Sequence, residues 1–224
     1  MFEAEKELTA IRLRELEETP IKGSFNFAHL KAIHKYIFQD IYEWAGEVRT
    51  VEISKGNLFC TTACIQSYAQ VVFKKYFPQC QAAQENTETF IRVLAENYGD
   101  LNALHPFREG NGRAQREFAR LVCMECGYDF NLSVTNHAAM LAASKLSFEK
   151  GDSSGFTQIF SMAVNNSKDL VLDCNSLKIL TSDDLTIDST IDYTCSYNEP
   201  KNIDSYCKLY RAKISFMGEK RKTL

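Results

Sequence analysis

The sequence predicts a mainly α-helical domain that carries one short β-hairpin and is followed by a C-terminal extension with strand-like sequence. The 224 residues are 45% hydrophobic and 25% charged, which is the composition of an ordinary globular chain. Apolar residues recur at spacings of three and four through most of the first 170 residues, and this is the period of an amphipathic helix. In one stretch only, apolar and polar residues alternate around a glycine turn, which is typical of a hairpin.

The apolar periodicity predicts six helices. They cover residues 25–40, 61–77, 87–104 and 113–126, with two shorter helices near 134–148 and 154–165. Pro78 is expected to end the second helix, because proline cannot continue the hydrogen-bonding pattern. Gly127 is expected to cap the fourth, because glycine readily adopts the left-handed conformation found after helix ends.

The hairpin is expected at about residues 48–60, between the first two helices. Val48–Ser54 forms the alternating strand, Lys55-Gly56-Asn57 the turn, and Leu58–Cys60 the returning strand. A single short hairpin is marginally stable in water. We therefore expect it to rest on another part of the domain.

We place a domain boundary near residue 169, giving a domain of residues 1–169 and an extension of residues 170–224. Segments of the extension such as LKILTS and LTIDSTIDY are strand-like and are separated by Ser, Asp and Asn. They suit either a small β appendage or an arm that covers the domain. The sequence does not indicate the role of this extension.

Charge and apolar patterning exclude several classes of protein. The net charge of −3 gives no bulk electrostatic reason to bind nucleic acid directly or an anionic membrane. No window approaches 18 uninterrupted apolar residues, so no membrane span is expected. The N-terminus is acidic and lacks the apolar core of a signal peptide, which favours a cytoplasmic protein and leaves delivery into another cell open.

The eight cysteines are too sparse for a disulfide-stapled mini-domain. Cys123 and Cys126 form a CxxC pair inside an apolar helical run, without a second pair at zinc-finger spacing. We interpret the cysteines as buried small hydrophobic residues in a reducing compartment, with a metal or redox site as the alternative.

The chemistry lies in the stretch HPFREGNGRAQR, which runs from His105 to Arg116. Gly110 and Gly112 permit positive φ and close approach of the backbone. The next helix begins near Arg113, so the N–H groups of its first turn face the loop, an arrangement that binds phosphate. Arg113 and Arg116 lie on one face of that turn, where a phosphate would relieve their conflict with the helix dipole.

Two further side chains complete a reactive set. Glu109, a carboxylate beside a phosphate site, is explained if Mg²⁺ bridges it to phosphate oxygens. His105 is a histidine, whose ordinary pKa is about 6.5, and can accept a proton from an attacking hydroxyl group. The residues therefore indicate phosphoryl or nucleotidyl transfer.

At every specified position this stretch matches HPFx(D/E)GNGRxxR, the signature of Fic-domain proteins. The run GSFNFAHLKAIHKYIFQDIYEWAG resembles the N-terminal helices of that family. Residues 42–60, YEWAGEVRTVEISKGNLFC, resemble its segment leading into a β-hairpin called the flap. The resemblance covers about residues 8–165 and implies a Fic-type helical bundle with a flap.

The resemblance implies a protein adenylyltransferase that moves AMP from ATP onto a Tyr, Thr or Ser hydroxyl of a target protein and releases pyrophosphate. His105 would be the general base and Glu109 would hold Mg²⁺. The residues that would bind the ATP phosphates are Gly110, Asn111, Gly112, Arg113 and Arg116. Phe107 would anchor the loop in the core.

The resemblance also assigns a role to the turn of the hairpin. Ser54, Lys55, Gly56 and Asn57 would pair with an extended stretch of the target, or contact the edge of the nucleotide. Adding a strand in this way gives affinity through main-chain hydrogen bonds, with little dependence on sequence.

Other functions on the same fold remain open. They are a phosphotransferase like the death-on-curing toxin, transfer of another nucleotide or of phosphocholine, removal of AMP from a modified protein, and a binding module without catalysis. Gly112 argues against the phosphotransferase, which carries lysine at that position. The presence of the complete motif argues against the binding module.

Two modes of regulation are expected. The first is inhibition by a small antitoxin-like partner protein, as for the toxin of a toxin–antitoxin pair. The second is inhibition by the chain itself through Glu219, because Ser215 and Glu219 have the spacing of the family's inhibitory (S/T)xxxE(G/N) helix, although Lys220 replaces its last residue. The sequence identifies neither the target protein nor the oligomeric state.

Overall fold

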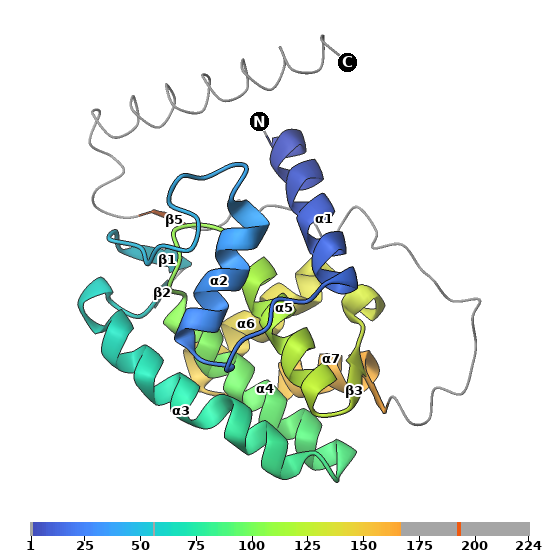
Figure 1. Ribbon diagram of the computed structural model, residues 1–224. Helices are drawn as coiled ribbons and strands as arrows, with labels where there is room; N and C mark the ends of the chain where they lie inside the picture. Colours follow the sequence, from blue (N-terminus) through green and yellow to red (C-terminus); the bar gives the residue numbers. More distant parts are fainter. Residues whose placement is uncertain (1, 56, 167–191, 194–224) are drawn as a thin grey trace.

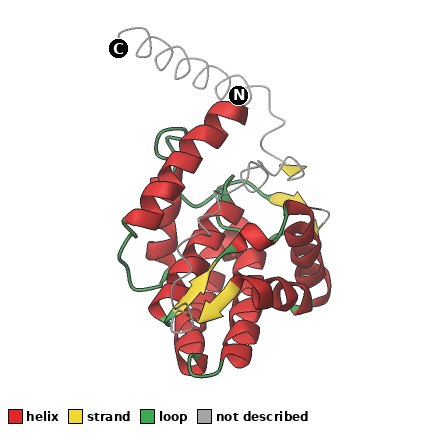
Figure 2. Ribbon diagram, turned by 90° about the vertical axis from the view of Figure 1, so that its right-hand side faces the viewer, coloured by secondary structure: helices red, strands yellow, loops and turns green. Residues whose placement is uncertain are grey.

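The structure is a computed structural model that describes residues 2–55, 57–166 and 192–193 of the chain (Figure 1). Within these ranges it forms seven α-helices: α1 (Phe2–Glu18), α2 (Phe27–Phe38), α3 (Ile65–Ala83), α4 (Thr87–Leu104), α5 (Asn111–Glu125), α6 (His137–Lys150) and α7 (Ser154–Ala163). The strands are β1 (Ile53–Lys55), β2 (Asn57–Leu58), β3 (Tyr128–Phe130), β4 (Val164–Asn166) and β5 (Asp192–Tyr193). The prediction of a mainly helical domain is confirmed, and strands make up little of the structure (Figure 2).

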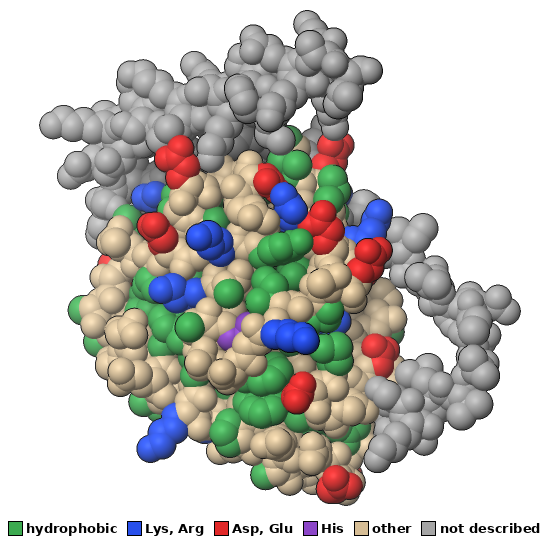
Figure 3. All heavy atoms as spheres, in the orientation of Figure 1, with side chains coloured by type: hydrophobic (Ala, Val, Ile, Leu, Met, Phe, Trp, Pro, Cys, Tyr) green, Lys and Arg blue, Asp and Glu red, His purple; other side chains and the backbone are tan. Residues whose placement is uncertain are grey.

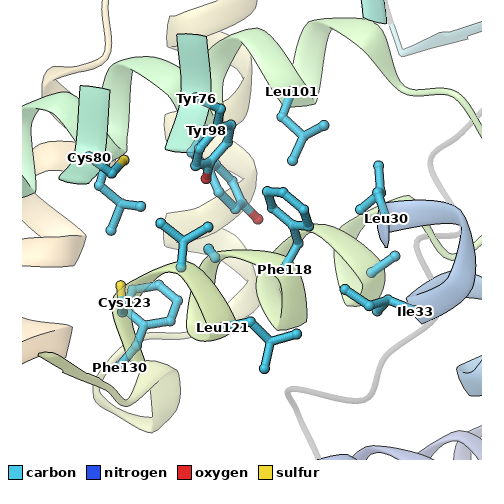
Figure 4. Close-up of a cluster of buried hydrophobic side chains, with 14 of the residues drawn as sticks. Leu30, Ile33, Tyr76, Cys80, Tyr98, Leu101, Phe118, Leu121, Cys123 and Phe130 are labelled. Atoms are coloured by element: carbon cyan, nitrogen blue, oxygen red, sulfur yellow. The ribbon is translucent and has the colours of Figure 1, made fainter. Parts of the chain in front are cut away.

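Helix α4 lies at the centre of the bundle, where it contacts α3, α5, α6 and α7. Helix α2 packs against α5, and α1 packs against α2 (Figure 1). Phe118 of α5 points into the core between α3 and α4 (Figure 4), where its ring meets that of Tyr76 edge-on at 5.3 Å. The junction between α4 and α5, which carries the candidate motif, is thereby supported on several sides.

The predicted helices are present, and two of their boundaries differ from expectation. Pro78 does not end a helix, because α3 continues through it to Ala83. Proline has no N–H, so the carbonyl of Lys74 loses its helical donor. Lys74 and Pro78 are both exposed, so water can satisfy that carbonyl. The fully buried Cys80 packs the last turns of the helix against the core. Helix α5 begins at Asn111, two residues earlier than expected, with Gly110 as its N-cap.

The hairpin forms with shorter strands than the alternation predicts. β1 pairs antiparallel with β2 and also with β5, giving the order β2-β1-β5. The first expected strand is cut short because the backbone N–H of Arg49 donates to Pro106 O (2.9 Å), at the end of α4. As expected, the hairpin rests on another element, since Val51, Ile53 and Phe59 form a small cluster with Phe148 of α6.

The cysteines that the structure describes are free thiols. Cys80, Cys123 and Cys126 are buried, and burial raises the pKa of the Cys126 thiol to about 11. Because a thiol of that pKa stays protonated and unreactive at neutral pH, the interpretation of Cys123 and Cys126 as small hydrophobic residues is confirmed. The remaining cysteines at 174, 195 and 207 lie outside the described residues.

The extension of residues 170–224 lies outside the described residues, except for β5, which is the end of the expected LTIDSTIDY strand. The Ser215–Lys220 segment also lies outside the described residues. The boundary near residue 169 therefore stays a prediction. In the part of the chain that is described, no helix has the length and apolar character that a membrane crossing needs. On the face shown in Figure 3, acidic and basic side chains are interspersed, in keeping with the nearly balanced charge.

Candidate active site

His105 stands directly after α4 in a left-handed conformation, with φ of 40° and ψ of 61°. This conformation is uncommon for a residue other than glycine and is held by the backbone N–H of His105, which donates to Leu101 O (3.3 Å). The ring atom Nδ1 lies 3.1 Å from Asn102 O. A carbonyl oxygen only accepts, so Nδ1 carries the proton and Nε2 is the basic atom. The imidazole is therefore in a tautomer that can act as a base.

The plane of this imidazole is fixed by the flap. The ring of Phe59 stacks on the ring of His105 with centroids 3.8 Å apart and an angle of 14° between the planes. Phe59 in turn packs near Phe148 of α6 (5.2 Å). The base thus lies against an aromatic surface that the hairpin supplies.

The loop between the helices is closed by the side chain of Asn111. Its Nδ2 donates to Phe107 O (2.7 Å), and its Oδ1 accepts from Phe107 N–H (2.9 Å). Both polar atoms of the side chain are engaged in these bonds, and the backbone N–H of Asn111 belongs to the first turn of α5. The predicted role of Asn111 in the loop is thus a structural one in addition to any contact with phosphate.

Two glycines permit the close packing of this loop. Gly110 has φ of 78°, and a Cβ atom there would lie 2.1 Å from the Phe38 ring, so only glycine fits. A Cβ on Gly112 would lie 3.3 Å from Nη1 of Arg116. Gly110 offers no side chain to cap α5, and the first N–H groups of a helix need acceptors from outside it. The N-terminus of α5 is therefore suited to an anion.

Glu109 lies beside this helix end with its side chain 13% exposed. Its Oε1 accepts from Gly110 N–H (2.8 Å) and lies 3.8 Å from Nη2 of Arg113. A carboxylate oxygen next to an anion site is the donor type that Mg²⁺ prefers when it is shared with phosphate oxygens. In the described residues no group of three or more His, Cys, Asp or Glu side chains is placed to hold a metal ion.

The two motif arginines have different surroundings. Arg113 is buried, and its Nη2 forms an ion pair with Glu5 of α1 (2.7 Å), whose other carboxylate oxygen accepts from Tyr42 OH (2.8 Å). Nη1 of Arg113 donates to Thr9 Oγ1 (3.2 Å). Arg116 is half-buried and borders the cleft. Sequence reasoning missed Glu5, because nothing marks it among the acidic residues of α1.

These residues line one cleft. His105, Glu109, Gly110, Asn111, Gly112, Arg113 and Arg116 lie on one side of it. Helix α6 forms another wall with His137, Met140, Leu141, Ser144, Lys145, Phe148 and Glu149. Sequence reasoning did not find this wall, because its residues show only the ordinary spacing of a helix. The cleft therefore places the motif residues opposite a wall of both apolar and polar side chains.

The predicted flap residues belong to the hairpin. Ser54 and Lys55 lie in β1 and Asn57 in β2, whereas Gly56 lies outside the described residues. Of the described hairpin residues, Phe59 borders the cleft and Ser54 does not. The role of these four residues in docking a target or touching the nucleotide remains a prediction.

The side chain of His34 in α2 contacts the motif loop through a hydrogen bond and through ring stacking. Its Nδ1 accepts from Gly46 N–H (2.9 Å), so its Nε2 carries the proton that is donated to Glu109 O (2.9 Å). The ring also stacks on Phe107 at 3.8 Å. Burial is the main cause that lowers the pKa of His34 to about 4. Its position on an apolar helical face predicts packing, as observed, but does not reveal the hydrogen bond to the loop.

Residues 24–123 match the Fic/DOC family. Protein adenylyltransferase VbhT of Bartonella schoenbuchensis is 40% identical over 135 residues, which are 60% of this chain and 28% of that protein. This chain therefore spans little more than a quarter of the length of that relative. A second relative, named "Probable protein adenylyltransferase Fic" in Escherichia coli K12, is 32% identical over 73% of this chain and 80% of its own length.

Solved structures of Fic domains have the same fold. The N-terminal Fic domain of a Bep effector from Bartonella quintana, solved with bound ADP, matches with a TM-score of 0.70 and 24% identity over 75% of this chain and 86% of its own. The type IV secretion system effector BepA matches with a TM-score of 0.65 and 27% identity over 73% of this chain and 60% of its own. The predicted Fic-type fold is confirmed.

The low pKa of His34 predicts a pH-dependent stability. In the folded state its pKa of about 4 lies below the ordinary 6.5, so the unfolded chain binds the proton first and stability falls as the pH drops from 6.5 towards 4. Linkage gives a loss of about 2 kcal/mol at pH 5. His34→Gln should remove this term, and urea unfolding at pH 7.5, 6 and 5 measures it.

The expected result is that the wild-type chain is the more stable at pH 7.5, by about 1–3 kcal/mol for a lost buried hydrogen bond, and that the difference shrinks at pH 5. Other titrating groups are common to both proteins and cancel. Parallel pH dependences for the two chains would show that His34 is not the group responsible.

Proposed function

This chain belongs to the Fic/DOC family, and we propose that it is a protein adenylyltransferase, which moves AMP from ATP onto a hydroxyl group of a target protein. The observation that carries the proposal is the α4–α5 junction. It places the basic Nε2 of His105 on the same cleft as an uncapped helix N-terminus and Arg116. The names of the relatives as protein adenylyltransferases support the same reaction.

ATP would lie along the cleft with its phosphates at the N-terminus of α5. The N–H groups of the first turn and the guanidinium group of Arg116 supply hydrogen bonds to phosphate oxygens. Met140, Leu141 and Phe148 of α6 border the same cleft, and apolar side chains are suited to cover a nucleoside base. A solved relative at 20% identity, BepC from Bartonella tribocorum, was crystallised with AMPPNP.

The transfer itself uses His105 as the base. Nε2 takes the proton of the target hydroxyl group while the hydroxyl oxygen forms a bond to the α-phosphorus of ATP. The bond between the α-phosphorus and the bridging oxygen breaks, and pyrophosphate leaves with that electron pair. The bond from Nδ1 to Asn102 O stabilises the imidazolium that forms, because the carbonyl faces the positive ring.

Glu109 would hold Mg²⁺ together with phosphate oxygens of the nucleotide. When bound, the metal ion would neutralise charge that builds up on the phosphates. Arg113 is buried and its guanidinium group is held by Glu5 at 2.7 Å and Glu109 at 3.8 Å, whereas the guanidinium group of Arg116 is half-buried beside the cleft and is the more accessible of the two to a phosphate. We therefore assign the main phosphate contact among the two arginines to Arg116.

The target would dock as an added strand on β1, with Ser54, Lys55, Gly56 and Asn57 near the contact. In this chain β5 pairs with β1, with Ile53 opposite Tyr193 and Ser54 opposite Asp192. A target strand would compete with residues 192–193 for that edge, since a strand has one partner on each side. Covering of the flap by the extension is a third mode of regulation, beside Glu219 and a small antitoxin-like protein.

We place the working site of the enzyme in the cytoplasm, either of the cell that makes it or of a cell into which it is delivered. The described cysteines are free thiols, which fits a reducing compartment. A role as the toxin of a toxin–antitoxin pair belongs to the same proposal.

The test of the activity is the mass gained by protein targets incubated with the chain, Mg²⁺ and ATP, after a tagged ATP analogue has identified the labelled protein in a lysate. We expect a gain of AMP, whereas a gain of phosphate would replace the proposal with phosphotransfer.

His105→Ala should lower the rate of transfer by at least ~10²-fold, the usual contribution of general base catalysis, with ATP affinity within a few-fold of wild type. More than a tenth of the rate would mean that another group accepts the proton.

Substitution of Arg113 and of Arg116 should have different effects on ATP binding and on stability. Arg116→Ala should weaken ATP binding and lower the transfer rate with little change in stability. Arg113→Ala should also destabilise the fold, by about 3 kcal/mol, because it leaves the carboxylate of Glu5 buried without its cation. Calorimetric titration with ATP and thermal unfolding measure both effects. An Arg116→Ala protein unchanged in ATP affinity and rate would remove Arg116 from the site.

The modes of regulation are distinguished by three proteins: the full chain, Glu219→Gly, and a chain ending at Lys168. If the extension covers β1, the shortened chain should modify its target faster and Glu219→Gly should match wild type. If Glu219 is the inhibitor, its substitution alone should raise activity by about tenfold or more, on release of about 1.4 kcal/mol. Equal activity of all three would assign any inhibition to another chain.

A further inference from the structure

Arg49 is a buried cation outside the motif that the mechanism does not use. Its side chain has no exposed surface, and its three nitrogens point in three directions. Nε donates to His105 O (2.8 Å), Nη1 donates to Val51 O (2.9 Å), and Nη2 donates to Cys60 O. All three acceptors are backbone carbonyls, so the contacts depend on the path of the chain and not on the side chains.

The three carbonyls belong to the two parts of the structure that must act together. Val51 precedes β1 and Cys60 follows β2, so they are the two ends of the flap. His105 is the proposed base. Two backbone bonds reinforce the same junction, since Arg49 N–H donates to Pro106 O (2.9 Å) and Cys60 N–H donates to Ala103 O (3.1 Å). One side chain therefore joins both ends of the flap to the end of α4.

The arrangement needs a guanidinium group. A lysine ammonium group can donate three hydrogen bonds, but from one atom, and cannot reach carbonyls that lie around a planar fork. Glu52 lies 3.5 Å from Nη1 and offsets part of the buried charge. Glu52 is itself held by the backbone N–H (2.9 Å) and the hydroxyl group (2.6 Å) of Thr62. Arg49 is thus fixed from both sides.

We propose that Arg49 is a positioning residue for the transfer reaction. Its guanidinium group ties both ends of the flap to the backbone of His105, so that the docked target and the general base keep a fixed relative position. This proposal rests on the function proposed above. It deepens that function by assigning to a residue outside the HPFx(D/E)GNGRxxR motif the alignment between the two halves of the site.

The physical reason is the geometry of His105. Its left-handed backbone conformation costs on the order of 1–3 kcal/mol and is held by what binds its N–H and its carbonyl. Without the bond to its carbonyl, the backbone can relax and the ring can leave both Asn102 O and the face of Phe59. A displacement of about 1 Å in a reacting group is enough to cost ~10²-fold in rate.

The test compares Arg49→Lys with Arg120→Lys in the full chain. Arg120 is a matched control, because it also donates to a backbone carbonyl, Leu16 O (3.0 Å), and pairs with a carboxylate, Glu117 (2.7 Å), but does not border the cleft. Thermal unfolding confirms that each protein is folded at the assay temperature. Titration with ATP then measures nucleotide binding, and steady-state kinetics use the protein labelled in the assay above.

We expect Arg49→Lys to lower kcat for that protein by ~10²-fold and to raise its KM, with ATP affinity within about twofold of wild type because the N-terminus of α5 keeps its contacts. The ¹⁵N shifts of the His105 ring give a second readout that needs no target. They should show a single Nδ1–H tautomer in wild type and in Arg120→Lys, and averaging of both tautomers in Arg49→Lys. Unchanged kcat or an unchanged tautomer in a folded Arg49→Lys protein would overturn the proposal.

If wild type labels no protein, the proposed function fails, and the ring shifts still decide the role of Arg49. If Arg49→Lys does not fold, hydrogen exchange on the unaltered chain decides it. The amides of Arg49, Phe59 and Cys60 donate to Pro106, Ile53 and Ala103 respectively. If Arg49 holds the junction as one unit, the three amides must exchange through a common opening with the same free energy of opening. Different free energies of opening at the three amides would overturn the proposal.

Discussion

The pair of hydrogen bonds between the Asn111 side chain and the backbone of Phe107 is the constraint on which the site depends. It holds the loop closed between the end of α4 and the start of α5. Because the loop is closed, Phe107 is fully buried against His34, and His34 can reach Glu109 O. The same closure brings His105, at the end of one helix, to the N-terminus of the next. The proposed base and the proposed anion site therefore lie on one cleft.

The positive charges around the N-terminus of α5 are compensated to different degrees. The N-terminus of α5 carries the positive end of a helix dipole and two arginines, which is unfavourable without an anion. The carboxylates of Glu5 and Glu109 offset the positive charge of the buried Arg113. The hydroxyl group of Tyr42 donates a hydrogen bond to the other carboxylate oxygen of Glu5. The first N–H groups of α5 need acceptors from outside the helix, and this is where we propose that a phosphate group binds.

The flap is too small to be stable by itself, and the structure holds it through contacts with its surroundings. Its apolar side packs on Phe148 of α6, its ends are held by Arg49, and Phe59 lies on the ring of His105. Helix α6 consequently has two roles, since it supports the flap and also lines the cleft. A change in the position of α6 would therefore alter both the cleft and the support of the flap.

The sequence by itself determined the helical architecture and the position of the family motif, because both depend on short-range patterns. The spacing of apolar residues locates α2, α4 and α5 to within a few residues. Twelve consecutive residues contain the proposed base, the candidate metal ligand and the proposed anion site, and Gly110 has the positive φ that its position in the loop suggested. The burial of Cys123 also followed from its helical surroundings.

Tertiary structure decided what depends on residues far apart in the chain. Arg113 meets Glu5 across 108 positions, and Arg49 meets His105 across 56, and neither pair has a spacing that a sequence pattern can show. Helix α3 passes through Pro78 because packing of Cys80 outweighs the lost hydrogen bond. Local propensity fixes where helices and turns can form, whereas the partners of buried charges and the length of a hairpin are set by which surfaces the folded chain brings together.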